Sequence, residues 1–533
     1  MIKKHFNTAG PVNMEEHYKL DPLTRWKLDD VMDLINEKKY FLLHAPRQSG
    51  KTSCLLALRD KINAEENYSC LYVNIEAARG AKNNIEAGVR SILTACKNEV
   101  RVLFGRKKEI KELVKDIIEE GNFESALNDF LYELSEFFEK PLVLLIDEID
   151  SLHGDLIISI LSQFRAGYAN RGKAFPHSIM LTGVLDIKDY RLLNIAPKHI
   201  TGGSCFNIKS ESLTIGNFSR DEIERLYLEH TKDTGQQFED GVFDLVYEYT
   251  SGQPWLVNAL AHESCSKMKE NRDRSIMITV KMMKEAKKRL ILSKQTHLDQ
   301  LADKLKQDRI RNVIQPIIEG ENLELDLDTQ DIIYCRDMGL IKKTDLGWAI
   351  ANKIYQEVIP RELTESLQDR FLIDYPKPVW VNEDQSINIE KLMNLFVEFW
   401  RKNSDSWKIG LSGYIEAAPH LIFQGFLQRV GNGRGEIDRE FALGSKRVDV
   451  YLEWESPVGE QRVIFELKMH TENNHLPTIK KDALIQTAEY ADKCNATESH
   501  LLIFDRRENI DWKDKIFTET KEENGYKIKI WGM

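Results

Sequence analysis

The chain has 533 residues, of which 42% are hydrophobic and 30% are charged, as in ordinary soluble globular proteins of several domains. Its formal net charge of −11 argues against a protein that coats nucleic acid by bulk electrostatics, because such proteins carry a basic excess. No apolar run approaches the roughly 20 residues that span a bilayer, and the N-terminal MIKKHFNTAGPVN lacks the apolar core of a signal peptide, so we expect a cytoplasmic protein without membrane contacts.

The N-terminal part predicts an α/β fold. KKYFLLHAPRQSGKTSCLLALRDKI reads as a strand, a tight loop and an amphipathic helix, and CLYVNIEA reads as a second strand. After a charged helical stretch, PLVLLIDEID and HSIMLTGVL are apolar runs typical of strands buried on both faces. Such alternation predicts a parallel sheet covered by helices on both sides, and we assign this core to residues 1–210.

Helical segments follow. SRDEIERLYLEH opens on Ser219, whose hydroxyl can cap the first turn, and we assign a helical lid to residues 211–295. Residues 296–365 end in GLIKKTDLGWAIAN, whose two strand-like pieces resemble the wing of a winged-helix module; a plain helical extension is an equal alternative. IDYPKPVWVNEDQS, with two prolines, predicts a linker, which with the following helix occupies residues 366–405.

The remaining residues, 406–533, predict a second α/β domain with the order αβββαβ. The helices are EAAPHLIFQGFLQRV and TIKKDALIQTAEYADKC, and the strands are EIDREFAL, RVDVYLEWE, RVIFELKM and SHLLIFD. The third strand places Glu466 and Lys468 on one face, because side chains alternate along a strand. Alone, this pattern is more typical of an edge strand with one solvated face.

APRQSGKT matches the phosphate-binding loop G-x-x-x-x-G-K-[ST] except that Ala45 replaces the first glycine. Backbone N–H groups can cradle phosphate, Lys51 can reach the β- and γ-phosphates, and Thr52 can ligate magnesium. The sequence therefore predicts an ATP site. Its predicted loop residues are Ala45, Pro46, Arg47, Gln48, Ser49, Gly50, Lys51, Thr52 and Ser53.

LLIDEID supplies the acids that this site needs. Asp147 comes at the carboxyl end of a buried strand, where ligands collect in open α/β sheets, and can hold the magnesium ion. Glu148 beside it is the candidate that polarises the attacking water. Alone, the segment would be evenly balanced between an acidic loop and a metal site, and the phosphate-binding loop favours the metal site.

These motifs give the N-terminal half a resemblance to AAA-type and signal-transduction ATPases. SGQPWLVN resembles their Gly-x-Pro lid motif, which implies that Pro254 lies near the nucleotide; a proline that simply starts a helix is the alternative. The resemblance also implies a sensor at Thr182 and an arginine finger at Arg165, Arg171 or Arg191. It leaves open a homo-oligomer in which a neighbouring copy supplies the arginine.

A second candidate site lies in the C-terminal domain. Asp449 precedes Glu466 by about one hairpin, so the two carboxylates can meet on one side of paired strands. Such carboxylates repel each other unless a divalent cation lies between them. Lys468 offsets part of the charge and could orient or deprotonate a water aimed at phosphate. The set predicts an oxygen-ligand site for Mg²⁺ or Mn²⁺.

Asp449 and the Glu-x-Lys that follows, on the αβββαβ order, resemble the PD-(D/E)xK nuclease superfamily. Gln486 and Tyr490 in QTAEY are similar to the Gln-x-x-x-Tyr helix of its exonuclease-like branch, although ordinary helix residues are the alternative. The departure from the family pattern is Val448, where proline often precedes the aspartate. The resemblance implies Asp449, Glu466, Lys468 and Gln486 as catalytic residues.

The same resemblance implies the metal ligands Asp449, Glu466 and Leu467, together with an additional acid at Glu416. Glu440 on the first strand is a weaker alternative to Glu416, which could equally be a helix-start acid. Nearly the whole chain resembles a bacterial group of AAA-like ATP-binding proteins fused to such nuclease domains.

Two functions remain open. The first is an ATP-regulated, divalent-metal-dependent nuclease that hydrolyses DNA, with defence against foreign or mobile DNA as the setting that the resemblance implies. The second is a non-catalytic, ATP-dependent switch or DNA-binding regulator with an inactive nuclease-like domain. Cleavage that needs metal and is lost on changing Lys468 would separate the two.

Overall fold

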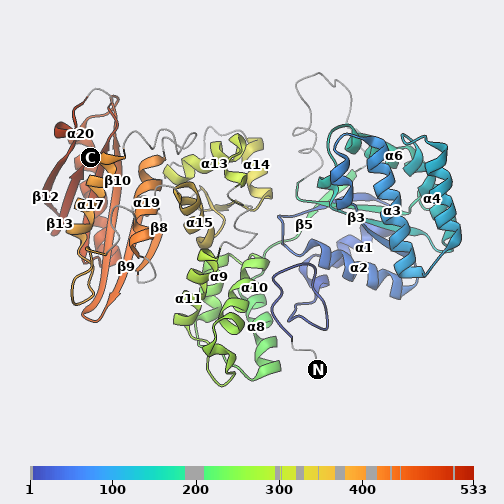
Figure 1. Ribbon diagram of the computed structural model, residues 1–533, viewed down its shortest axis with the longest axis horizontal. Helices are drawn as coiled ribbons and strands as arrows, with labels where there is room; N and C mark the ends of the chain where they lie inside the picture. Colours follow the sequence, from blue (N-terminus) through green and yellow to red (C-terminus); the bar gives the residue numbers. More distant parts are fainter. Residues whose placement is uncertain are drawn as a thin grey trace. The chain divides into compact units, whose positions relative to one another are not determined.

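The computed structural model divides into two units, each with its own sheet (Figure 1). The first unit comprises Met1–Met283 and Arg336–Gly339, and the second comprises Lys284–Cys335 and Leu340–Met533. The structure describes residues 4–185, 209–293, 301, 303–319, 329–345, 347–365, 378–403, 417–431, 435–443, 446–507 and 510–533. Among the helices in these ranges, none is long and apolar enough to cross a bilayer.

The first unit is built on a five-stranded sheet in the order β2-β3-β4-β1-β5, in which every pairing is parallel. Its strands are β1 (Tyr40–His44), β2 (Ser69–Asn74), β3 (Leu142–Asp147), β4 (Ser178–Gly183) and β5 (Lys209–Thr214). Strands β1, β3 and β4 are buried throughout, as their apolar sequences require. The predicted parallel α/β fold is confirmed.

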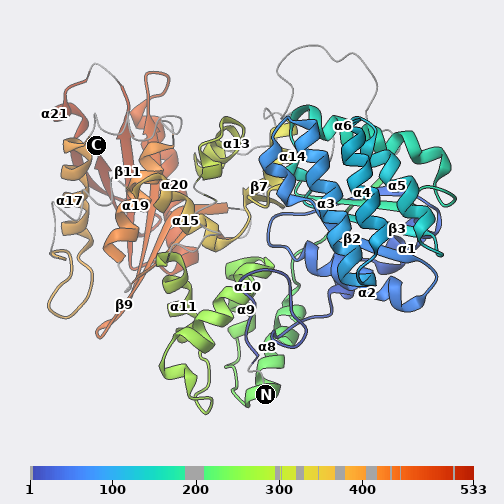
Figure 2. The ribbon, with the colours of Figure 1, turned by 45° about the vertical axis from the view of Figure 1, so that its right-hand side comes forward.

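Helices α1 (Leu28–Asn36) and α2 (Lys51–Glu65) cover one face of this sheet through a shared apolar cluster. Helices α3 (Ile85–Phe104), α4 (Lys108–Glu120), α5 (Ala126–Phe137) and α6 (Gly154–Gly167) pack on one another (Figure 2). α3 also reaches strand β2. The phosphate-binding loop thereby joins an interior strand to a helix anchored in the core.

Strand β5 was not expected from the sequence. KSESLT carries polar side chains and no apolar run, so its pairing with β1 at the sheet edge leaves little pattern to detect. The strand spans the predicted boundary at residues 210/211, and its end leads directly into the helices of the lid.

The helices of the predicted lid are α8 (Arg220–Thr234), α9 (Val242–Thr250) and α10 (Pro254–His262); their role as a lid stays a prediction. The predicted cap at Ser219 is present as a reciprocal capping box with Glu222. Between α9 and α10, Gly252 has φ +72°, and a Cβ there would lie 1.8 Å from the carbonyl oxygen of Phe218. Only glycine therefore lets this loop meet the segment that follows β5.

We predict that Gly252→Ala destabilises the first unit much more than Gly235→Ala does. Gly235 has a similar φ of +79° but open space around its Cβ position, so its substitution adds only the left-handed strain, about 1–2 kcal/mol. Gly252→Ala adds a clash with the Phe218 backbone. Thermal unfolding of the two variants measures the difference, and equal shifts in the unfolding temperature would contradict this account.

The second unit opens with a mostly helical part that contains one hairpin. Its elements are α13 (Asp308–Glu319), α14 (Thr329–Asp337), β6 (Ile341–Thr344), β7 (Gly347–Ile350) and α15 (Lys353–Leu363). α11 (Val280–Leu292) spans the division between the units. β6 and β7 pair antiparallel, which confirms the two strand pieces read in GLIKKTDLGWAIAN. Their assignment to a winged-helix module stays a prediction.

A six-stranded sheet in the order β12-β13-β11-β10-β9-β8 forms the core of the second unit. Its strands are β8 (Gly435–Leu443), β9 (Lys446–Ser456), β10 (Gly459–His470), β11 (Glu498–Asp505), β12 (Phe517–Glu523) and β13 (Tyr526–Gly532). β10 pairs antiparallel with β9 and parallel with β11, so it is an interior strand and not the edge strand that its two charges suggest alone.

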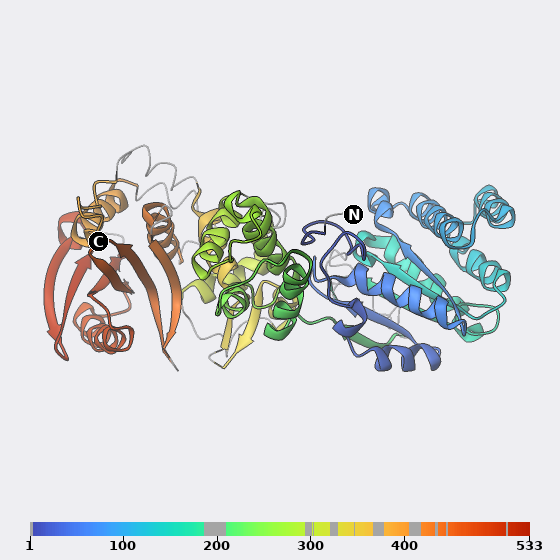
Figure 3. The same ribbon diagram turned by 90° about the horizontal axis from the view of Figure 1, so that it is seen from below.

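Three helices cover the two faces of this sheet: α17 (Ile389–Lys402), α19 (Ala418–Gly431) and α20 (Leu476–Cys494) (Figure 3). On one face, the rings of Phe465 and Phe504 contact Phe423 of α19 and Phe396 of α17. On the other, residues such as Ile464 pack against α20. Glu466 and Lys468 therefore lie on the α20 face, because they alternate with Phe465.

Two features of this unit go beyond the sequence reading. The hairpin of β12 and β13 extends the sheet past β11, which was the last expected strand, and FTETKEE is too charged to show a strand pattern. Helix α17, expected to follow a linker before the domain, packs on the sheet, and its Glu390 accepts a hydrogen bond from Lys529 of β13 at 2.7 Å.

Candidate functional site

The phosphate-binding loop follows β1 and ends where α2 begins, at Lys51. Gln48 and Gly50 have φ of +58° and +94°, and these left-handed residues give the loop its turn. Ala45 at the first position is 2% exposed and forms part of the core cluster, so an apolar side chain is accommodated there. Backbone N–H groups at the start of α2 are thus placed for an anion.

Lys51 lies inside this loop. Its Nζ donates hydrogen bonds to the carbonyl oxygens of Ala45 and Pro46 at 2.8 and 3.0 Å. Burial lowers the pKa of Lys51, while Asp150 and Asp147 act in the opposite direction. A phosphate in the loop would replace the two carbonyl groups as a stronger, charge-assisted acceptor.

Thr52 and Asp147 come together as predicted. The Thr52 hydroxyl donates to Asp147 Oδ2 at 2.7 Å, and the Tyr72 hydroxyl donates to the same atom at 3.0 Å. Asp147 is 1% exposed, and burial raises the pKa of its carboxyl group while these two hydrogen bonds oppose the rise. A hydroxyl and a carboxylate at this spacing are oxygen ligands suited to Mg²⁺.

Glu148 follows in a left-handed conformation, with φ +65°, which turns its side chain out of the strand direction. Burial, together with the charges of Asp150 and Asp147, raises the pKa of Glu148 to about 7. A carboxyl group with a pKa near the working pH is suited to accept a proton from water. Arg79 lies 3.8 Å from its Oε2 atom, near enough to orient it.

The candidates for sensor and arginine finger differ in their surroundings. Thr182 on β4 is fully buried between β1 and β3, and its hydroxyl has no hydrogen-bond partner in the described part of the chain. Arg171 is held by the carbonyl oxygens of Lys38 and Tyr168, whereas Arg165 of α6 is exposed. Arg191 lies outside the described residues.

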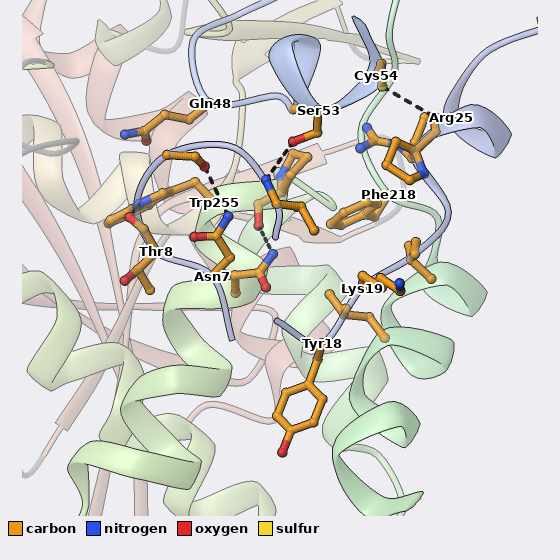
Figure 4. Close-up of a pocket in the computed structure, with 18 of the residues that line it drawn as sticks. Asn7, Thr8, Tyr18, Lys19, Arg25, Gln48, Ser53, Cys54, Phe218 and Trp255 are labelled. Carbon is orange, nitrogen blue, oxygen red and sulfur yellow. Dashed lines mark hydrogen bonds between the residues drawn. The ribbon is translucent and has the colours of Figure 1, made fainter. Parts of the chain in front are cut away.

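A cavity of about 130 Å³ opens beside the loop (Figure 4). Its lining combines Gln48, Gly50 and Ser53 of the loop region with Pro254 and Trp255 of α10. Pro254 thus lines this cavity and also starts α10, as the alternative reading of the motif has it; its contact with nucleotide stays a prediction.

A further part of the cavity wall comes from a segment that the sequence reading assigned no role, residues 5–20, here called the strap. Val12 N–H donates to Ser53 Oγ at 3.0 Å, and Trp255 Nε1–H donates to the Thr8 carbonyl oxygen at 2.9 Å (Figure 4). The buried ring of Phe6 contacts the ring of Tyr227 on α8. The strap thus joins the loop to the lid.

Arg25, another residue of the cavity wall, was also not singled out from the sequence. Its guanidinium lies 4.4 Å from the centre of the Phe218 ring and donates to the carbonyl oxygens of Ser49 and Gly216. A single arginine in a loop gives no sequence signal without aligned relatives. Two further predicted loop residues have different surroundings. Arg47 Nη2 lies 3.6 Å from Asp150 Oδ2, and Ser49 is buried with its hydroxyl unpaired among the described residues.

The second candidate site lies on β9 and β10. Phe465 pairs with Val450, which brings Glu466 beside Asp449. Asp449 Oδ2 accepts a hydrogen bond from the Leu467 backbone N–H at 2.8 Å, and Glu466 Oε1 accepts one from Lys468 Nζ at 2.6 Å. The structure therefore brings together the aspartate, the glutamate and the lysine that the sequence singled out.

Glu466 is 1% exposed, and its Oε2 atom has no hydrogen-bond partner in the described part of the chain. Burial, followed by the charge of Asp449, raises the pKa of Glu466 to about 8. Burial lowers the pKa of Lys468, but the charges of Glu466 and Asp449 outweigh it and the pKa is raised. This direction favours a charged Lys468 that neutralises and orients over one that accepts a proton.

Helix α20 completes the cluster. Gln486 Nε2 donates to the Tyr490 hydroxyl at 2.7 Å, and the charges of Glu466 and Asp449 reach Tyr490, whose pKa is raised chiefly by burial. Glu416 lies outside the described residues, and the side chain of Glu440 does too. Within the described ranges, no group of three or more His, Cys, Asp or Glu residues that could hold a metal ion is found, and Asp449 and Glu466 are a pair of carboxylates.

Residues 30–360, more than half of the chain, match the model of the family described as the AAA-like domain. The chain belongs to the AAA-like domain family. The expectation of an AAA-like P-loop ATPase is confirmed for this part of the chain, which contains the phosphate-binding loop and Asp147 described above. That these residues form its ATP site stays a prediction.

Solved structures similar to this AAA-like protein include the Walker-type ATPase PABY2304 of Pyrococcus abyssi, at 14% identity and a TM-score of 0.46, covering 66% of this chain and 99% of that one. The ORC2 protein of Aeropyrum pernix, in its ADPNP–ADP complexes, has 12% identity and a TM-score of 0.38 over 63% and 94%. The RuvB Holliday junction branch migration motor of Thermotoga maritima is 11% identical, with a TM-score of 0.33, and the match covers 63% of this chain and 95% of that one. Among curated proteins, no match was found.

We predict that Lys51→Ala lowers the affinity for Mg-ATP about 10- to 100-fold, the loss expected for hydrogen bonds to a charged group. Titration with a fluorescent ATP analogue measures it. Lys61→Ala is the matched control, because Lys61 lies on the same helix and pairs with Glu65 one turn further on. Equal affinities of the two variants would contradict the role of Lys51.

We predict that Glu148→Gln slows ATP hydrolysis by about 100-fold or more and leaves ATP affinity unchanged, because it removes the proton acceptor and keeps the shape. Release of inorganic phosphate measures the rate. Glu76→Gln is the control, since Glu76 also lies near Arg79, at 3.9 Å, but is exposed. Hydrolysis at the normal rate in Glu148→Gln would assign the proton to another group.

Proposed function

We propose that this AAA-like protein is an ATP-regulated, divalent-metal-dependent DNA nuclease whose C-terminal α/β domain is of the PD-(D/E)xK type. One observation carries the proposal: Asp449, Glu466 and Lys468 meet on the α20 face of an interior strand, and a buried oxygen of Glu466 lacks a partner among the described residues. Buried carboxylates left in this way are characteristic of cation sites.

The residues present fit a divalent cation. Asp449 Oδ and Glu466 Oε atoms are the hard oxygen ligands that Mg²⁺ and Mn²⁺ prefer, and the carbonyl group of Leu467 between them is a further candidate. Burial, followed by the charge of Asp449, raises the pKa of Glu466, and a cation beside its carboxylate would oppose both effects. Glu416 is proposed as an additional ligand from the family resemblance alone.

In the proposed mechanism, a bound cation would supply Lewis acidity and a nucleophilic water at neutral pH. Lys468, kept charged by Glu466, neutralises the phosphodiester and orients the water. Gln486, fixed by its hydrogen bond to Tyr490, holds the substrate or water from the α20 side. The chain's own residues thus bind and orient, and they leave the activation of water to the metal.

ATP does not drive the cut, because hydrolysis of a phosphodiester is downhill. We infer instead that nucleotide state controls assembly, movement on DNA or access to the second site. Residues Arg336–Gly339, at the end of α14 and just after it, belong to the first unit and support such control: Asp337 Oδ2 lies 3.7 Å from His44 Nδ1, and a Cβ on Gly339 would lie 2.9 Å from Pro46 of the loop.

DNA is the proposed partner, bound locally because the net charge is −11. The part with α13, α14 and the β6–β7 hairpin is proposed as a winged-helix module on its order of elements. A homo-oligomer in which an exposed arginine such as Arg165 reaches a neighbouring ATP site is proposed on the family resemblance. Defence against foreign or mobile DNA is the proposed setting on the same ground.

The second candidate function is a non-catalytic ATP-dependent switch or DNA-binding regulator. The hydrogen bond from Lys468 to Glu466 favours this switch, because the lysine already neutralises part of the charge that a metal ion would otherwise have to neutralise. The two functions differ in whether phosphodiester bonds break.

We predict that the full chain cleaves plasmid or linear DNA only with Mg²⁺ or Mn²⁺, and that Asp449→Asn, Glu466→Gln and Lys468→Ala each lower the rate at least 100-fold. Gel electrophoresis with and without ATP measures cleavage. Lys481→Ala is the control, because Lys481 is exposed on α20. No cleavage by the unmodified chain under any metal and nucleotide condition would favour the switch.

A further inference from the structure

A chain of three side chains closes the carboxyl ends of β10 and β11. His470 and Asp505, the last residues of the two strands, are partners in the parallel register, and His470 Nδ1 lies 3.4 Å from Asp505 Oδ2. Arg507 holds that carboxylate with two nitrogen atoms: Nη2 donates to Oδ2 at 2.6 Å and Nε donates to Oδ1 at 3.0 Å. Arg507, Asp505 and His470 thus form a continuous series.

Electrostatics act on the imidazole ring from its Nδ1 side. Burial raises the pKa of Asp505, but the hydrogen bonds and charge of Arg507 outweigh it and lower the pKa, so Asp505 is ionised. An ionised carboxylate beside Nδ1 favours the form of histidine with a proton on that nitrogen. Asp505, itself held by Arg507, thus faces the Nδ1 side of the ring.

The other nitrogen of His470 is available. The residue is 5% exposed, and its side-chain partner among the described residues is Asp505. Its Nε2 atom has no hydrogen-bond partner in the described ranges and is not one of the nitrogen atoms sealed from solvent. A polar atom that is not sealed and has no partner within the described part of the protein is suited to meet a ligand.

The place of His470 connects it to the proposed nuclease site. Glu466, Lys468 and His470 alternate along β10 and share the α20 face. Successive side chains on one face are about 7 Å apart. His470 is thus the next polar side chain beyond Lys468, at the strand end, and neither the family match nor the proposed mechanism uses it.

We propose that His470 binds the phosphate next to the scissile phosphodiester, with Asp505 and Arg507 as positioning residues. Phosphates repeat along a nucleic-acid strand, so cationic groups at neighbouring positions of β10 contact neighbouring phosphates. With Nδ1 turned to Asp505 at 3.4 Å, Nε2–H is the donor that His470 can offer to a phosphate oxygen. This inference rests on the proposed nuclease function and names a part of its substrate contact.

The variant His470→Asn separates this role from a purely structural one. An asparagine amide can take the position of Nδ1 and keep the contact with Asp505, but it has no group at the position of Nε2. His470→Gln does the reverse, since its amide reaches toward the Nε2 position. The control is His475→Asn, which changes an exposed histidine in the loop between β10 and α20.

The experiment uses the full chain, with a fluorescent DNA duplex in EDTA for binding and in Mg²⁺ for cleavage. For His470→Asn we expect Kd and KM to rise about tenfold with little change in kcat. The slope of log K against log salt should fall by about 1, as for one lost phosphate contact. The unfolding temperature should stay unchanged, His470→Gln should keep most of the affinity, and His475→Asn should match the unmodified chain.

Other results overturn the inference. Unchanged Kd and salt slope in His470→Asn, or equal losses in His470→Asn and His470→Gln, would make the series a structural clamp. An unmodified chain that binds DNA, loses affinity on His470→Asn and never cleaves would overturn the proposed nuclease while keeping the phosphate contact. A chain that neither binds nor cleaves DNA would overturn both.

Discussion

A carboxylate buried at an interior strand needs hydrogen-bond donors or positive charge, and both candidate sites depend on how this need is met. Asp147 and Glu466 are each 1% exposed. In the first unit, Thr52 and Tyr72 donate to one oxygen of Asp147, and the backbone N–H of Glu148 donates to the other. In the second unit, Lys468 donates to one oxygen of Glu466, and the other lacks a partner within the described residues.

This difference gives the two sites different characters. The nucleotide site holds its acid by hydrogen bonds that exist without a ligand, so its geometry is prepared for ATP and magnesium. The second site is stabilised in part by Lys468, while burial and the charge of Asp449 raise the pKa of Glu466 to about 8 and one of its oxygens has no partner among the described residues. Removing a side chain that donates to Asp147 or Glu466 would leave a buried charge without compensation. Experiments on the two acids therefore use conservative substitutions that keep the shape of the side chain.

Much of this arrangement could be predicted because its signals are local. The loop from Ala45 to Thr52 has a fixed spacing, and an apolar run before Asp147 marks a buried strand. The alternation in RVIFELKMH placed Glu466 and Lys468 on one face, although the interior position of β10 came only from pairing with β9 and β11. Strand pairing joins distant segments, and a single sequence does not encode it as a pattern.

The parts that were not predicted share a cause. The strap, Arg25 and the β12–β13 hairpin consist of polar or irregular segments, and they acquire meaning only from tertiary contacts. Val12 of the strap donates a hydrogen bond to Ser53, and Trp255 of α10 donates one to Thr8 of the strap, so each bond joins residues far apart in the chain. His470 illustrates the same limit, because its partner Asp505 lies on another strand after an intervening helix.

The central claim is that Asp449 and Glu466 hold a divalent cation, and calorimetric titration of Mn²⁺ into the nucleotide-free full chain tests it most directly. The account predicts a binding event in the unmodified chain that disappears in Glu466→Gln and persists in Lys51→Ala. Identical Mn²⁺ binding in the unmodified chain and in Glu466→Gln, or no binding in either, would contradict it.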